Sequence, residues 1–138
     1  KKPVPPRLPV LDRKVTFDEV DTQVLRKTCR HCHTNPDIAR GDGGPGMTGG
    51  FGFAPRKLDF STYESTNGGL LDLKGERMSV FSKTKDGTPL LVAGLIARQR
   101  EEAGEIDPDV RGMPLGLPAV SAEDVQLVET WIAQGRPQ

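Results

Sequence analysis

The feature that most constrains this 138-residue chain is a cluster of its two cysteines with a histidine. They form the sequence Cys29-Arg30-His31-Cys32-His33, in which the thiols are three positions apart and an imidazole follows directly. Residues i and i+3 lie on one face of a helix, so a helix that runs into this segment presents both thiols on the same side. We therefore expect the two thiols and His33 to serve one site.

This spacing is the attachment signature of a c-type haem. Cys29 and Cys32 would form thioethers with the two vinyl groups of one porphyrin, and His33 would be the proximal ligand of the iron. His31 lies between the two thioether positions, so we expect it to point away from the iron into solvent.

Three other interpretations of the cysteines remain open. A redox-active dithiol also uses C-x-x-C, but it is typical of a βαβ pattern, which is not found here. A zinc site needs two further well-spaced ligands, and the sequence holds no second C-x-x-C. The third is a simple structural disulfide.

Composition predicts a small core. Gly contributes 16 residues and Pro 12, together about 20% against a background of roughly 12%. Leu, Ile, Val and Phe contribute about 24%, just above the roughly 20% below which chains tend to stay disordered. A porphyrin would then be the largest apolar body inside, and we expect its removal to unfold the domain.

The charge balance and the apolar runs exclude two classes of function. Nineteen basic and nineteen acidic side chains give a formal net charge of zero, which argues against a dedicated nucleic-acid binder. No window approaches the roughly 18 uninterrupted apolar residues of a membrane span. The chain begins at Lys1 without an apolar signal region, which is typical of a processed mature form or a recombinant product.

Periodicity and capping signals predict an all-α protein. Residues 1–15 are Pro-rich, which favours an extended arm, and the Gly-rich residues 34–58 are expected to form a long loop. No convincing strand is found. The expected helices run from Thr16 to about Cys32 with a Thr16-x-x-Glu19 capping box, from Ser61 to Gly68, from Thr88-Pro89 to about Ala103, and from Ser121 with Asp124 in its first turn to Gly135.

Over residues 16–135 the chain resembles class I monohaem c-type cytochromes. Three elements carry the resemblance: the helix leading into residues 29–33, the sequence Gly44-Pro45-Gly46-Met47-Thr48-Gly49, and Gly112-Met113-Pro114 followed by a last helix containing Trp131. It implies a cytochrome c-like fold of three to five helices with long loops wrapped around one covalent haem. The chain would comprise the arm, 1–15, and a single cytochrome c domain, 16–138, with an enlarged segment 59–111.

The resemblance also implies a set of haem contacts. Met113 precedes the last helix, where the family places its distal ligand, and a thioether sulfur suits haem iron. Met78 is the weaker candidate, and Met47 falls where family members pack an apolar side chain against the porphyrin. The carbonyl of Pro45 would accept the second ring N–H of His33, unless Pro45 only shapes a Gly-rich turn.

The sequence departs from the family on the first helix. Small members carry a glycine eight residues before the first cysteine, which lets the terminal helices cross closely. Asp21 occupies that position here. The gap between His33 and Met113 is also longer than in compact members, which is why segment 59–111 is expected to carry additional structure.

The implied function is one-electron transfer by a single haem c with His/Met ligation and no catalytic residue. The resemblance implies a monomer in an oxidising extracytoplasmic compartment such as a bacterial periplasm, with other cytochromes or redox enzymes as partners. Two alternatives remain open: a haem-based sensor or ligand-binding domain with a displaceable distal ligand, and the haem domain of a larger redox enzyme. A peroxidase is less favoured because no distal His–Arg pair has recognisable spacing.

Overall fold

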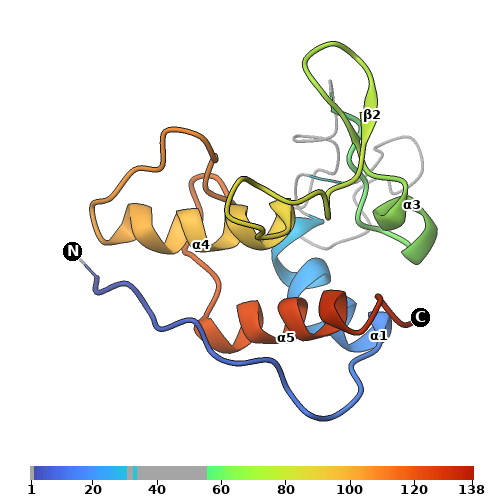
Figure 1. The fold of residues 1–138 in the computed structure, drawn as a ribbon, viewed down its shortest axis with the longest axis horizontal. Coiled ribbons are helices and arrows are strands. Elements are labelled where there is room, and N and C mark those ends of the chain that lie inside the picture. The colour runs from blue at the N-terminus through green and yellow to red at the C-terminus, as the bar shows by residue number, and fades with distance from the viewer. Residues whose placement is uncertain (1, 31–32, 34–55) are drawn as a thin grey trace. The chain divides into compact units, whose positions relative to one another are not determined.

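The computed structural model describes residues 2–30, 33 and 56–138, which form a mostly helical protein with one small sheet (Figure 1). These residues divide into two compact units. The first unit comprises Lys1–Val20 and Lys83–Pro137, and the second comprises Asp21–Ser82 with Gln138. The elements are α1 (Phe17–Val20), the π-helix η1 (Asp21–Cys29), α3 (Tyr63–Asn67), β1 (Leu70–Leu71), β2 (Arg77–Met78), α4 (Leu90–Glu102) and α5 (Ala122–Ala133).

The core of the first unit is built around α5. This helix begins as predicted, because the Ser121 hydroxyl accepts a hydrogen bond from the Asp124 N–H at 3.1 Å. Trp131 is fully buried, its ring centroid lies 5.9 Å from that of Phe17, and its indole N–H donates to the Pro137 carbonyl at 2.8 Å. The buried apolar side chains of this unit are Val15, Val20, Val92, Leu95, Ala97, Val120, Val125, Leu127, Val128 and Trp131.

The Pro-rich arm runs along α5 (Figure 1). Arg7 forms a bidentate pair with Glu129, with N–O distances of 2.9 and 2.7 Å. An extended Pro-rich segment has no internal hydrogen bonds, and here polar side chains of α5 and the residue after it bind its main chain. The pairs are Leu11 N with Thr130 Oγ1 (2.9 Å), Val15 N with Gln134 Oε1 (2.9 Å), Gln126 Nε2 with Pro9 O (2.7 Å) and Gln134 Nε2 with Arg13 O (2.8 Å).

The start of α1 forms only half of the predicted capping box. The Glu19 N–H lies 3.4 Å from the Thr16 hydroxyl, as that motif requires. The Glu19 carboxylate instead pairs with the Arg13 guanidinium, with two N–O distances of 2.7 Å. This pair lowers the pKa of Glu19 from its ordinary value.

Helix α4 begins at Leu90, one residue later than the Thr88-Pro89 signal predicts. Thr88 belongs instead to a turn, in which its N–H donates to the Asp86 carboxylate at 3.0 Å and its carbonyl accepts the Thr84 N–H at 2.8 Å. The Thr84 hydroxyl, and after it the side chain and N–H of Thr88, lower the pKa of Asp86 to about 2. The carboxylate therefore keeps this turn charged even in acid.

The first helix of the second unit differs from the prediction. Helix α1 is followed directly by η1, in which the hydrogen bonds span five residues; the Arg30 N–H closes the last turn on the Leu25 carbonyl at 2.9 Å. The helix ends at Cys29 rather than near Cys32. Cys32 and His31 lie outside the described residues.

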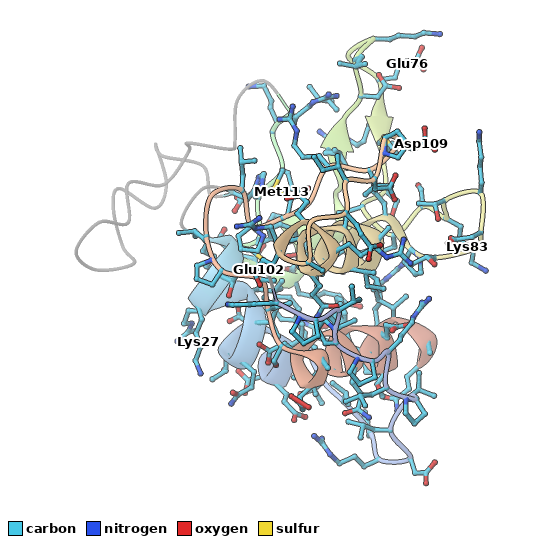
Figure 2. The ribbon with its side chains drawn as sticks, turned by 90° about the vertical axis from the view of Figure 1, so that its left-hand side faces the viewer. Lys27, Glu76, Lys83, Glu102, Asp109 and Met113 are labelled. Carbon is cyan, nitrogen blue, oxygen red and sulfur yellow. The ribbon has the colours of Figure 1, made fainter. Side chains whose placement is uncertain are left out.

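The expectation of no strands is wrong. Strands β1 and β2 pair antiparallel, with Leu70 opposite Met78 and Leu71 opposite Arg77. Asp72 closes the connecting turn, because its carboxylate accepts from the N–H groups of residues 74 and 76, each at 2.9 Å. Figure 2 labels Glu76 at this end of the hairpin. The strands have two residues each, too few for an alternating pattern to show in the sequence.

Helix α3 (Tyr63–Asn67) confirms the short helix expected after Ser61. The Thr62 hydroxyl and the Ser65 backbone and side chain form a reciprocal capping box there. Among the described residues, no helix is long and apolar enough to cross a membrane.

The arm gives a test of the first unit. Gln134→Ala removes two hydrogen bonds to the arm. One is accepted from the partly buried Val15 N–H, and the other is donated to the Arg13 carbonyl. We expect a loss of about 1–2 kcal/mol in the free energy of unfolding. Urea titration followed by the fluorescence of Trp131 measures it.

Gln126→Ala is the matched control, because that side chain makes one exposed bond to the arm. Its loss should stay within about 0.5 kcal/mol. Equal losses in the two variants would contradict the assignment of Gln134 as the main attachment of the arm.

Candidate functional site

The described part of the 29–33 segment forms a tight turn at the end of η1. Cys29 is the last helical residue and is half-buried. The His33 N–H donates to the Cys29 carbonyl at 2.9 Å, which brings the first thiol and the imidazole onto one turn of chain. The Nδ1 atom of His33 is buried, although the residue as a whole is half-buried.

A second segment of the same unit packs against His33. The Phe60 N–H donates to the His33 carbonyl at 2.9 Å. The Phe60 ring is 2% exposed and meets the imidazole edge-on, with ring centroids 5.7 Å apart and an interplanar angle of 88°. The imidazole is thus bounded on one side by an apolar ring, which limits its rotation.

Arg30, between the two cysteines, connects these parts. Its guanidinium donates to the carbonyls of Phe60 (3.1 Å) and Ser61 (2.7 Å) and pairs with the Asp21 carboxylate at 2.6 Å. No motif in the sequence predicts a role for Arg30 or Phe60. The residue that indicated such a contact is Asp21, an acidic residue at a position where small class I c-type cytochromes carry glycine.

Met113 lies in the first unit, on the segment that folds back against α4 (Figure 2). It is half-buried, and its N–H donates to the Gly94 carbonyl of α4 at 3.0 Å. The preceding N–H, of Gly112, donates to the Glu101 carboxylate at 3.0 Å. The peptide bond from Met113 to Pro114 is cis.

Helix α4 holds the end of this segment as well. Arg98 donates to the Leu117 carbonyl at 2.8 Å and pairs with Glu101 at 3.3 Å. The buried Gln99 donates to the Val120 carbonyl at 3.0 Å. Polar side chains of one helix therefore fix the segment from Gly112 to Val120. An Arg and a Glu three positions apart on one helix were the only sequence signal for this role.

The structure brings together some of the predicted site residues. Cys29 and His33 share one turn of the second unit, whereas Met113 belongs to the first unit. Met78 is half-buried in β2 of the second unit. Cys32, Pro45 and Met47 lie outside the described residues, so their assigned roles stay predictions.

The chain matches no protein-family model, no curated protein and no solved structure. In the part of the chain that the structure describes, no group of three or more His, Cys, Asp and Glu side chains is placed to hold a metal ion. The interpretation of the site depends on its own residues.

The close approach of the Met113 segment to α4 can be tested through two glycines. A Cβ at Gly112 would overlap the Glu101 carboxylate and lie 2.8 Å from the Cα of Arg98. We expect Gly112→Ala to lower the free energy of unfolding by about 1–3 kcal/mol. Urea titration measures the loss, and the NMR resonance of the Met113 methyl group should move.

Gly94→Ala is the control on the other side of the same contact. Its Cβ would meet the Arg111 carbonyl at 3.6 Å and the Met113 Cβ at 4.0 Å, which are ordinary van der Waals distances. Alanine is also the better helix former, by about 1 kcal/mol. Gly94→Ala should therefore be neutral or stabilising, and a loss as large as that of Gly112→Ala would contradict this geometry.

Proposed function

We propose that this protein is a monohaem c-type cytochrome that carries one electron between partner proteins. The observation that carries the proposal is the Cys29-Arg30-His31-Cys32-His33 sequence, whose first thiol and imidazole share one turn after a helix. A structural disulfide needs no adjoining imidazole, and a redox-active dithiol is typical of a βαβ pattern, which is not found in the sequence, whereas a c-type haem uses all three side chains.

The described donor side chains fit a haem by their chemistry. Cys29 would form one thioether, and His33 would bind the iron through one ring nitrogen. A hydrogen bond donated by the other ring nitrogen of His33 would set its tautomer. Cys32 would form the second thioether. Met113 would supply a thioether sulfur to the iron, a soft donor that raises the reduction potential.

A bound haem supplies a one-electron couple between ferric and ferrous iron. The task of the chain is then to keep both ligands in place in either redox state, so that little reorganisation accompanies the transfer. His33 is held through its own N–H and carbonyl, to Cys29 and Phe60. Met113 is held through its N–H to Gly94.

Compartment and partners follow from the same proposal. Covalent haem attachment of this type implies an oxidising extracytoplasmic compartment, such as a bacterial periplasm. Other cytochromes or redox enzymes would exchange electrons with the protein, which acts as a monomer without a catalytic residue of its own.

The distal ligand can be tested by a pair of substitutions. Met113→Ala should abolish the long-wavelength sulfur–iron band of the oxidised protein and lower its reduction potential, because the thioether donor is lost. Met78→Ala should change neither. Optical spectra and a redox titration of the two haem-loaded variants measure both effects; loss of the band in Met78→Ala instead would show that the ligand is Met78.

Carbon monoxide separates an electron carrier from a haem-based sensor. A carrier with both axial positions held by the protein should not bind the gas rapidly in its reduced form at neutral pH. We expect an unchanged spectrum of the reduced wild-type protein and rapid binding in Met113→Ala. Rapid binding by the wild type would contradict the carrier function and favour a ligand-binding domain.

A further inference from the structure

We propose that Arg30 is a positioning residue for the His33 imidazole and acts on it through Phe60. The proposal rests on His33 being the iron ligand of the proposed function. Arg30 lies between the two cysteines, but its side chain is only 17% exposed and so does not serve as a solvated surface charge. Its guanidinium is engaged within the second unit.

The guanidinium of Arg30 binds three oxygens. Nε donates to the Phe60 carbonyl at 3.1 Å, while Nη2 donates to the Ser61 carbonyl at 2.7 Å and pairs with Asp21 Oδ1 at 2.6 Å. This arrangement needs the rigid planar fork of arginine. The single ammonium of a lysine keeps the charge but cannot reproduce the fork.

Phe60 transmits this arrangement to the imidazole. Its carbonyl is bound by Arg30, and its N–H donates to the His33 carbonyl at 2.9 Å, so both main-chain polar groups of Phe60 are tied to the 29–33 segment. Its ring meets the imidazole edge-on at 5.7 Å. A shift of the Phe60 main chain therefore moves the ring that bounds His33.

Asp21 supplies the negative charge that pairs with the guanidinium. Its side chain is 7% exposed, and a buried charge of this kind requires an opposite charge. Arg26 also reaches it, at 3.3 Å, but its side chain is 61% exposed, and its partner in this pair is Asp21 alone, not Phe60 or Ser61. Arg26 thus shares the ion pair without sharing the connection to His33.

The test compares Arg30→Lys with Arg26→Lys in the haem-loaded protein. In Arg30→Lys we expect the Phe60 amide to exchange about tenfold faster, since a supporting hydrogen bond is lost. We also expect a shift in the electron paramagnetic resonance g values of the oxidised protein, which depend on the orientation of the axial imidazole plane. Arg26→Lys should change neither quantity.

Phe60→Leu provides a second route should Arg30→Lys fold poorly. It removes the ring contact but keeps both main-chain bonds, so the g values should shift while exchange at residue 60 stays within about twofold.

Two outcomes would overturn the proposal and are distinguishable. If the haem-bearing Arg30→Lys and Arg26→Lys variants have the same exchange rate at the Phe60 amide and the same g values, the role of Arg30 alone is overturned. A chain that takes up no haem would overturn the proposed function, and the ligand role of His33 with it.

Discussion

The backbone of His33 is bonded on both sides, and the described site depends on this constraint. Its N–H binds Cys29 at the end of the π-helix, and its carbonyl binds the Phe60 N–H. The first bond places Cys29 and His33 on one turn of chain, and the second brings the Phe60 ring against the imidazole. Because these are main-chain bonds, they are insensitive to the identity of the side chains between them. They define the geometry into which Arg30 fits.

The first unit uses a different device to hold Met113. One helix, α4, binds the segment from Gly112 to Val120 through a main-chain carbonyl and three polar side chains. Gly112 permits the approach because a side chain there would meet Glu101 and Arg98. Gly112 shows that a glycine of this chain can serve the close packing of a loop onto a helix, in addition to the use of glycine in turns. The apolar core of this unit is separate and is centred on Trp131.

The helices with clear end signals were predictable, and the polar contacts between distant residues were not. Ser121 and Asp124 locate the start of α5 correctly, because capping is a local interaction. The Thr88-Pro89 signal predicts the start of α4 one residue too early, because the main chain of Thr88 bonds to Thr84 and Asp86 in a turn. The same limit applies at the site. Cys29 and His33 are neighbours in sequence, whereas the contact of Arg30 with Phe60 spans thirty residues and leaves no periodic signal.

Both units contain buried apolar side chains among their described residues. Those of the second unit, which carries Cys29 and His33, are Val24, Leu25, Leu58, Phe60, Val80 and Phe81.

The intact mass of the chain tests the central claim most directly. The protein should be produced in a host that attaches c-type haem, denatured in acid and measured by mass spectrometry, beside a Cys29→Ser, Cys32→Ser double variant. We predict the mass of the chain plus one haem, retained after denaturation, and the mass of the bare chain for the double variant. A wild-type chain that carries no added mass, or that loses it on denaturation, would contradict covalent haem attachment at these two cysteines.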